Sequence, residues 1–209
     1  MKLVLASHNA KKLAELQTLF DGLPIELISQ GSLDIVEADE PHHTFVENAL
    51  AKARHASRAS GLAAIADDSG LCVAALGGAP GVQSAVYATV TLPVSEREAQ
   101  RRAQDAANNA LLLDRMRGVV DRRARFVSTL VAVRHADDAE PLIAFGRWDA
   151  ALLDAPRGSG GFGYDPLVWI EALGVSVAEL AAAQKNRLSH RALAAAQMRT
   201  LMGKAWRLC

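Results

Sequence analysis

The chain has 209 residues, of which 50% are hydrophobic and 5% aromatic, which is enough for one sizeable buried core. Its 23 basic and 23 acidic residues give a net charge of zero, which argues against a nucleic-acid-binding protein that relies on a basic surface. The two cysteines have no zinc spacing, and no apolar run approaches the roughly 18 residues of a membrane span. We therefore expect a soluble, cytoplasmic protein with no membrane partner and no stable nucleic-acid partner.

The first third of the chain alternates strand and helix patterns. Residues 3–6 are apolar and predict a buried strand, and apolar side chains recur at helical spacing over 13–20, after a loop and N-cap at 7–9. Residues 24–28 predict a second strand, followed by a polar, acidic loop over 30–44. Thr44 and Glu47 form a capping-box pattern for a helix that ends at Gly61.

The rest of the chain predicts a mixed sheet. Apolar runs on both sides of the Asp-Asp-Ser-Gly segment at 67–70 predict two strands joined by a tight acidic hairpin loop, and a long charged helix is expected over 95–117. Residues 126–133 predict a central strand with 142–153 as its antiparallel neighbour. After a glycine-rich loop at 157–164, two helices end the chain, the last over 189–206. We expect one α/β domain over 1–209, in which the strand pair at 125–153 is a candidate second lobe.

Asp67 and Asp68 form a pair of carboxylates at an expected sheet end. Hard cations and their phosphate ligands often bind at such ends, so the pair is a candidate metal site. Side chains of adjacent strand residues point to opposite faces, and we expect only one of the two carboxylates to enter the site. Taken alone, the motif is more typical of a capped turn, because Asp, Ser and Gly are turn formers.

Two segments at helix starts carry candidate phosphate contacts. Ser7–Lys12 lies where a strand gives way to a helix, and backbone N–H groups there attract anions. The charge of Lys12 opposes the helix dipole, and this local cost suggests a use such as phosphate binding. Taken alone, the segment is more typical of a plain N-cap with a solvated lysine. Lys185–Arg191 again places cationic groups at a helix start, capped by Ser189, and ordinary solvated residues are the alternative reading.

The glycine-rich loop contains a formal G-x-G-x-x-G from Gly158 to Gly163. A dinucleotide-binding fingerprint must follow a strand and open a helix, and this segment does not. Phe162 and Asp165 could instead stack on a base and hydrogen-bond it, with a plain flexible loop as the alternative.

Six segments together resemble the inosine triphosphatase family, pyrophosphatases that hydrolyse non-canonical purine triphosphates such as ITP, dITP and XTP. They occur in the family's order and spacing over nearly the whole chain. The resemblance implies a two-lobed α/β fold, with a mixed central sheet flanked by helices and a deep nucleotide-binding cleft. It also implies a homodimer and magnesium-dependent hydrolysis to the monophosphate and pyrophosphate. The segments are SHNAKK at 7–12, FVENALAKARHA at 45–56, AIADDSGL at 64–71, GGAPG at 77–81, GSGGFGYDPL at 158–167 and SHRAL at 189–193.

The resemblance further implies roles for single residues. Asp68 would accept a proton and hold Mg²⁺ together with Glu40, and Glu47 is a further candidate metal ligand. A loop over 162–165 would bind the base, and three donors near the end of the chain would meet its 6-keto oxygen. The implied substrate contacts are Ser7, His8, Asn9, Ala10, Lys11, Lys12, Lys52, Ser69, Phe162, Gly163, Tyr164, Asp165, Lys185, His190 and Arg191.

One departure from the family pattern is visible after the GGAPG segment. Many bacterial members read Ser-Ala-Arg-Tyr there, whereas Val86 stands in place of the arginine in this chain. The sequence therefore leaves open which triphosphates the protein accepts and how the edge of a dimer interface is formed. Two rival functions also stay open: a pyrophosphatase acting on pyrimidine or modified triphosphates, and a nucleotide sensor that binds without turnover.

Overall fold

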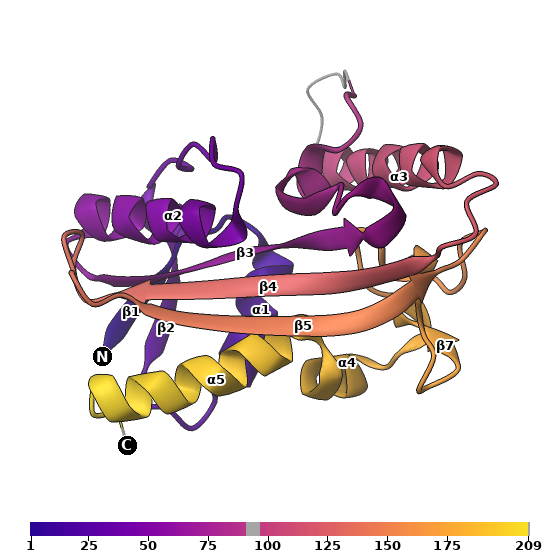
Figure 1. Ribbon diagram of the computed structural model, residues 1–209. Coiled ribbons are helices and arrows are strands. Elements are labelled where there is room, and N and C mark those ends of the chain that lie inside the picture. The colour runs from indigo at the N-terminus through magenta and orange to yellow at the C-terminus, as the bar shows by residue number, and fades with distance from the viewer. Residues whose placement is uncertain (91–96, 209) are drawn as a thin grey trace. The chain divides into compact units, whose positions relative to one another are not determined.

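A computed structural model describes residues 1–90 and 97–208 and shows a seven-stranded sheet in the order β2-β1-β3-β4-β5-β6-β7 (Figure 1). The strands are β1 (Lys2–Leu5), β2 (Glu26–Ser29), β3 (Ala63–Val73), β4 (Arg123–Val133), β5 (Leu142–Leu152), β6 (Val168–Ile170) and β7 (Val175–Ser176). The α-helices are α1 (Ala10–Leu19), α2 (Phe45–Ser60), α3 (Arg97–Arg115), α4 (Ala182–Leu188) and α5 (His190–Ala205). Short 3₁₀ helices are η1 (Gln30–Leu33), η2 (Ala74–Leu76), η3 (Gly81–Val86), η4 (Asp165–Leu167) and η5 (Val177–Glu179).

The sheet is mixed, as the sequence predicts. β1 pairs in parallel with both β2 and β3, whereas β6 pairs antiparallel with β5 and with β7. β4 and β5 are neighbours joined by residues 134–141, a connection too short for the crossover that parallel strands need. They are therefore the antiparallel pair expected from the sequence.

The predicted hairpin at residues 67–70 is wrong. β3 runs without a break from Ala63 to Val73, and the acidic segment lies inside it. Turn-forming residues are accepted in this strand because tertiary contacts hold them: Ser128 Oγ donates to Asp67 Oδ1 (2.8 Å). Gly70 is needed for close packing, since a Cβ at this position would overlap the Gly81 carbonyl.

The helix ends follow the predicted capping residues. Asn9, Thr44 and Ser189 are the N-caps of α1, α2 and α5, and Gly61 is the C-cap of α2. α1 begins at Ala10, earlier than the apolar pattern suggests, and η1 lies inside the predicted 30–44 loop. α3 ends at Arg115, whereas the first two residues of its predicted span, 95 and 96, lie outside the described residues.

The chain folds into two compact units. The described residues of Met1–Ser69, Ser128–Arg147 and Asn186–Cys209 form the first unit, and those of Gly70–Val127 and Trp148–Lys185 form the second. The expectation of a single domain over 1–209 stays a prediction. No helix in the described ranges is long and apolar enough to cross a membrane.

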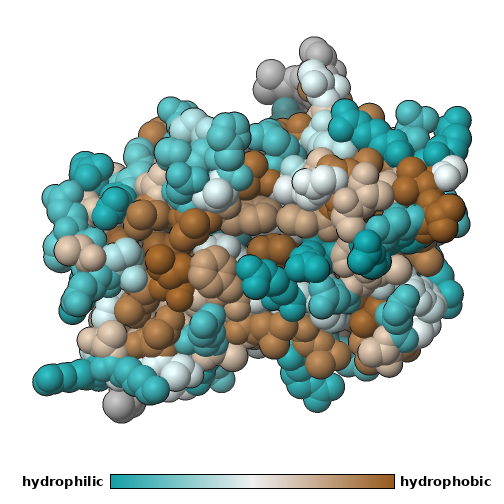
Figure 2. Space-filling model, viewed as in Figure 1, coloured by the Kyte–Doolittle hydropathy of each residue, from teal (hydrophilic) through white to brown (hydrophobic). Residues whose placement is uncertain are grey.

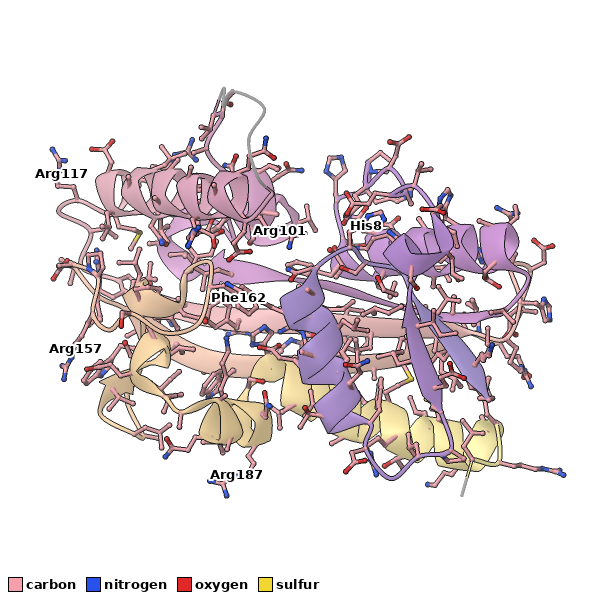
Figure 3. The ribbon with its side chains drawn as sticks, turned by 180° about the vertical axis from the view of Figure 1, so that it is seen from behind. His8, Arg101, Arg117, Arg157, Phe162 and Arg187 are labelled. Carbon is pink, nitrogen blue, oxygen red and sulfur yellow. The ribbon has the colours of Figure 1, made fainter. Side chains whose placement is uncertain are left out.

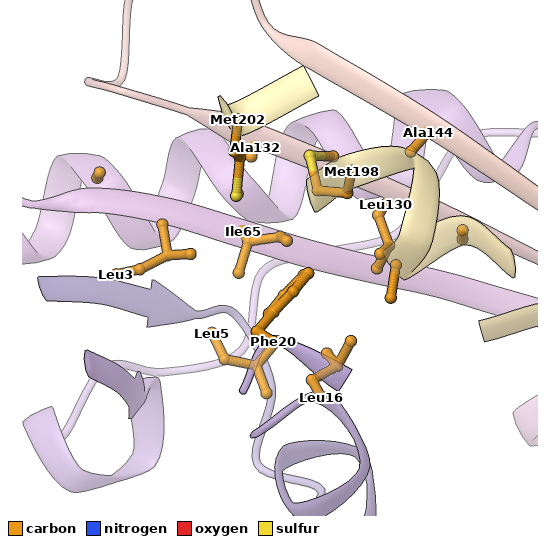
Figure 4. Packing of buried hydrophobic residues seen from close by; sticks show 13 residues of the cluster. Leu3, Leu5, Leu16, Phe20, Ile65, Leu130, Ala132, Ala144, Met198 and Met202 are labelled. Carbon is orange, nitrogen blue, oxygen red and sulfur yellow. The ribbon is translucent and has the colours of Figure 1, made fainter. Parts of the chain in front are cut away.

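In the first unit, helices cover both faces of the sheet because β1 alternates its side chains. Leu3 and Leu5 pack with Leu16 of α1 and Met198 of α5 (Figure 4), whereas Val4 packs against the alanines of α2. Small residues on α2, at positions 49, 53 and 56, let the helix backbone approach the strands. Both faces are buried in this way, so the strands read as continuous apolar runs.

Figure 2 shows hydrophobic side chains at the surface of this unit, between α2 and α5 on the face in view. The exposed apolar residues of the unit include Phe145 of β5 and Leu193 of α5. Next to Phe145, β5 packs closely against the start of α5. Only glycine fits at position 146, since a Cβ there would overlap the carbonyl of His190.

The second unit has a core of its own. Leu71 and Val73 of β3 pack with Leu112 and Met116 of α3 and with the apolar residues of β4 to β6. Tyr164 also belongs to this core. The packing of Tyr164 in this core thereby holds the glycine-rich loop next to α3.

Candidate active site

The two carboxylates of β3 point to opposite faces of the sheet in the first unit. Ala64 and Ala66 share a cluster with α2, whereas Ile65 shares one with α1 and α5. By alternation, Asp68 is directed to the α2 face and Asp67 to the α1 and α5 face. The ion pairs of the two carboxylates agree with this assignment, because Asp68 pairs with a lysine of α2 and Asp67 with a lysine of α1.

On the α2 face, Asp68 is held by Lys52. Lys52 Nζ donates to Asp68 Oδ1 (2.9 Å) and to Glu40 Oε2 (2.7 Å), so one ammonium links both carboxylates. Burial acts to lower the pKa of Lys52, but the charges of Asp68 and Glu40 outweigh it and raise that pKa. Lys52 is therefore a buried cation at pH 7.

The second carboxylate oxygen of Asp68 differs from the first in its hydrogen bonding. Asp68 Oδ2 is buried and has no hydrogen-bond partner among the described residues. Burial also raises the pKa of Asp68 to about 6, against the opposing charge of Lys52. A buried carboxylate oxygen without a protein partner is costly, which points to a ligand that binds at this oxygen.

A divalent cation suits this donor set. Carboxylate oxygens are the protein ligands that Mg²⁺ prefers, and the ion usually keeps water and substrate phosphate oxygens as its other ligands. Within the described ranges, no group of three or more His, Cys, Asp or Glu side chains could hold a metal ion on its own. Asp68 and Glu40 could supply two ligands of such an ion, with water or bound phosphate oxygens as the others.

Glu47 is placed differently from the two other candidate metal ligands, Asp68 and Glu40. It lies exposed in the first turn of α2, where Thr44 Oγ1 donates to its Oε2 (2.5 Å). The Glu47 N–H in turn donates to Thr44 Oγ1 (3.3 Å). The structure thus gives Glu47 a capping contact, and its contact with a metal stays a prediction.

On the opposite face, Asp67 is buried between two cations. Lys12 Nζ lies 3.0 Å from its Oδ2, and Arg191 donates to the same oxygen through Nε (3.2 Å) and Nη2 (3.1 Å). Burial acts to raise the pKa of Asp67, but Arg191 and Lys12 outweigh it and hold that pKa well below its usual range. Asp67 is therefore a permanent anion.

Arg191 is itself enclosed. Its side chain is 2% exposed, and its Nη1 also donates to Glu15 of α1. Its Nη2 donates to Ser69 Oγ (3.1 Å). Burial acts to lower the pKa of Arg191, but Asp67 and Glu15 outweigh it and raise that pKa. Arg191 and these three partners all belong to the first unit.

Lys12 and Lys52 meet at the backbone between the two carboxylates. Each ammonium donates to the carbonyl oxygen of Asp67 at 3.3 Å, one from α1 and one from α2. The two lysines predicted to bind phosphate are thus brought close together. The local cost of Lys12 in the first turn of a helix is offset by Asp67.

The remaining residues of the 7–12 segment shape the start of α1. Asn9 Oδ1 accepts hydrogen bonds from the backbone N–H groups of Lys11 (3.0 Å) and Lys12 (3.3 Å), and Ser7 Oγ accepts from the Asn9 N–H (3.1 Å). A phosphate would compete with Asn9 for those N–H groups. Ala10 and the side chain of Lys11 are exposed.

His8 lies just before α1 (Figure 3), and its Nδ1 is 2.9 Å from Glu37 Oε1. At the start of α5, His190 is a buried residue of the first unit. The substrate contacts expected for His8 and His190 stay predictions.

The second unit holds the predicted base-binding loop. Phe162 lies in this loop near α3 (Figure 3), and Lys185 Nζ is 4.4 Å from the centre of its ring. Lys185 Nζ also donates to Asp165 Oδ2 (2.6 Å), and this oxygen accepts the Phe162 N–H (2.9 Å). At Gly161, with a φ of 73°, a Cβ would overlap the same carboxylate. The aromatic face and the carboxylate of this loop are therefore brought together with the ammonium of Lys185 from α4. Among the described residues, no α-helix begins at the G-x-G-x-x-G pattern of the loop.

Sequence reasoning missed two residues that organise the carboxylates. Glu15 and Ser128 belong to none of the six motif segments, yet they contact Arg191 and Asp67. Glu15 lies one helical turn after Lys12, which is a weak signal on the sequence. Ser128 lies in an apolar strand, and its signal on the sequence is weaker still.

A model of the Ham1 family matches residues 3–201 of the chain. The chain belongs to the Ham1 family. It is 72% identical over 206 residues to the dITP/XTP pyrophosphatase of Methylibium petroleiphilum, covering 99% of each protein. It is 65% identical over 211 residues to the dITP/XTP pyrophosphatase of Leptothrix cholodnii, covering 100% of each.

Solved structures of Ham1 proteins have the same fold. The chain superposes on the HAM1 protein from Coxiella burnetii with a TM-score of 0.87 and 38% identity, covering 98% of this chain and 99% of that one. For the Ham1 protein from Staphylococcus aureus the TM-score is 0.82 and the identity 32%, covering 98% and 100%. The family resemblance of the six segments and the mixed α/β fold class are thereby confirmed.

Proposed function

We propose that this chain hydrolyses non-canonical purine nucleoside triphosphates (ITP, dITP and XTP) to the monophosphate and pyrophosphate, with Mg²⁺ as its cofactor, and so cleanses the nucleotide pool. The relatives from Methylibium petroleiphilum and Leptothrix cholodnii carry the name dITP/XTP pyrophosphatase. The observation that carries the proposal is the Asp68 carboxyl, of which one oxygen is bonded to Lys52 and the other is buried with no partner among the described residues.

The chemistry follows from this arrangement. Asp68 orients a water molecule for attack on the α-phosphorus and accepts its proton, as the bond to pyrophosphate breaks and the new P–O bond forms. Lys52 keeps the carboxyl in place, and with Lys12 it takes up negative charge that develops on the leaving pyrophosphate. Asp68 and Glu40 would hold Mg²⁺, which supplies further neutralisation of phosphate charge when bound.

Base selection falls to the loop at 162–165. Phe162 offers its ring for stacking, and the Lys185 ammonium is a donor that a 6-keto oxygen can accept. A 6-amino purine would turn its own donors toward this cation and leave buried groups unpaired, and sites of this kind discriminate by roughly 10⁴ or more. The contacts of His190 and Arg191 with the base rest on the family resemblance.

Several finer expectations belong to the same proposal. The homodimer, the deep cleft and the substrate contacts of Ser7, Asn9 and Ser69 rest on the family resemblance alone. The cytoplasmic location and the single domain over 1–209 rest on the composition of the chain and the pattern of its predicted elements. The neutral charge of the chain supports a small-molecule substrate over a nucleic acid.

Product identity tests the reaction directly. With ITP and Mg²⁺, we expect IMP and pyrophosphate in equal amounts, because attack occurs at the α-phosphorus. Nucleotides are separated by chromatography, and pyrophosphate and orthophosphate are measured separately. The Asp68→Asn variant, purified in parallel, controls for contaminating phosphatases. Appearance of IDP and orthophosphate before IMP would contradict the proposed reaction.

The stacking role of Phe162 predicts a uniform effect on substrates. Base–aromatic stacking is worth about 1–3 kcal/mol, so Phe162→Ala is expected to raise KM roughly 5- to 150-fold for ITP and ATP alike. The ITP-to-ATP ratio of kcat/KM should stay constant, because every purine presents a π-face. Phe145→Ala, at an exposed phenylalanine of β5, is the matched control. A KM for ITP that Phe162→Ala leaves unchanged would remove Phe162 from the site.

A further inference from the structure

Two side chains of α3 hold the backbone of the glycine-rich loop at Gly163. The Gly163 N–H donates to Asp105 Oδ2 (2.9 Å), and the Gly163 carbonyl accepts from Asn109 Nδ2 (3.0 Å). Asp105 and Asn109 are four residues apart in one helix and therefore lie on the same face. Gly163 has a φ of 61°, in the left-handed region. Both polar backbone groups of this turn residue are thus tied to one helix.

The amide of Asn109 is oriented by this contact. Its nitrogen faces the Gly163 carbonyl, while its oxygen Oδ1 is buried with no hydrogen-bond partner in the part of the chain that the structure describes. A buried amide oxygen without a partner is unfavourable. The bond to Gly163 is therefore what sets the orientation of the amide.

The neighbours of Gly163 are the residues expected to meet the base. Phe162 precedes it, and Tyr164 follows it with its hydroxyl bonded to the Ser84 carbonyl (2.9 Å). Asn108 of α3 donates to the same carbonyl (3.2 Å). The two dihedral angles of Gly163 determine the direction of the chain between Phe162 and the anchored Tyr164, and so they constrain the position from which the Phe162 side chain extends.

We propose that Asp105 and Asn109 are positioning residues for the nucleotide base. They hold the loop in its binding conformation before the substrate arrives, so that ordering it costs no binding free energy. The inference rests on the proposed function, because base binding by this loop is part of that proposal. It extends the site to a helix that carries none of the six motif segments.

Asp105→Ala and Asn109→Ala test the inference by separating KM from kcat. Each is expected to raise the KM for ITP about tenfold and leave kcat within about twofold, because loss of a positioning hydrogen bond weakens binding and not the chemical step. Asp105→Asn keeps an acceptor for the Gly163 N–H and should restore KM to within about threefold of wild type. Asn109→Asp sets an acceptor against the Gly163 carbonyl and should raise KM at least as much as Asn109→Ala. Arg102→Ala, at an exposed residue of the same helix, is the control.

A double-variant cycle shows whether the effect passes through Phe162. In a Phe162→Ala background, Asp105→Ala should change KM by less than about twofold, because no ring is left to position. Full additivity of the two effects would overturn the inference. So would an unchanged KM in both alanine variants, or a loss confined to kcat and Tm.

Calorimetry with IMP keeps the inference separate from the proposed reaction. The Kd of IMP should rise about tenfold in the same variants, and this measurement needs no turnover. If the wild type fails to hydrolyse ITP, the proposed function is refuted, and IMP binding still decides the role of Asp105 and Asn109. Wild-type turnover with unchanged IMP affinity in both variants would refute this inference alone.

Discussion

Asp68→Asn is expected to lower the turnover of ITP by at least about 10²-fold, the low end of the effect of losing a general base. The amide keeps the shape of the side chain and can still accept from Lys52, but it has neither the negative charge for Mg²⁺ nor a site for the proton of water. The measurement is kcat at saturating ITP and Mg²⁺, with the fold checked by circular dichroism and Tm.

Asp137→Asn is the matched control for this variant. Asp137 also belongs to the first unit and forms an ion pair, with Arg58 at 3.3 Å, but both side chains are exposed. Exposed pairs contribute little to stability, so its turnover and Tm should equal those of the wild type. Near-normal turnover of a folded Asp68→Asn protein would exclude Asp68 from the chemistry.

Replacing Arg191 by methionine is expected to lower the free energy of unfolding by about 3–5 kcal/mol, as is typical when one partner of a buried ion pair is removed. The change leaves the fully buried Asp67 with Lys12 as its remaining cation and also removes one ion pair of Glu15. Urea titration of the wild type and the variant gives the difference.

Arg187→Met separates the buried pair from a general effect of losing an arginine. Arg187 is exposed in α4, close in sequence, and its loss should change the free energy of unfolding by less than about 0.5 kcal/mol. Arg191→Lys keeps the charge but not the forked geometry, and an intermediate loss is expected. If Arg191→Met unfolds at the same urea concentration as the wild type, the ion pair with Asp67 does not stabilise the fold.

The ion pair also bears on substrate selection. The family resemblance assigns Arg191 to recognition of the 6-keto oxygen, whereas its hydrogen bonds join it to Asp67, Glu15 and Ser69. If the ratio of kcat/KM for ITP to kcat/KM for ATP falls in folded Arg191→Lys, the assigned role in base recognition is supported. If this ratio is unchanged, Arg191 acts only as a structural partner of Asp67.

The local parts of this fold could be predicted from the sequence because their causes are local. Thr44, Ser189 and Gly61 were predicted as helix caps, and each makes its contact within a few residues of the helix end. The apolar runs of β1 and β4 likewise show on the sequence that both faces are buried. Helix boundaries shifted by a few residues because the end of an apolar pattern is not the end of a helix.

The error at residues 67–70 has a tertiary cause. Asp, Ser and Gly favour a turn in isolation, and no local pattern in the sequence shows that Lys12, Lys52, Ser128 and Arg191 bind the two aspartates directly. Those contacts compensate the poor strand propensity of the acidic segment, and β3 continues through it.

The sequence by itself determined the family, the α/β class and the residues that carry the motifs, because each depends on residue type and spacing. Only the tertiary structure decided which charges are partners: Arg191 reaches Glu15 across 176 positions, and Lys52 joins Glu40 to Asp68. It also revealed the positions of α3 that hold Gly163. Such pairs arise when distant segments pack together, so no local window of the sequence contains them.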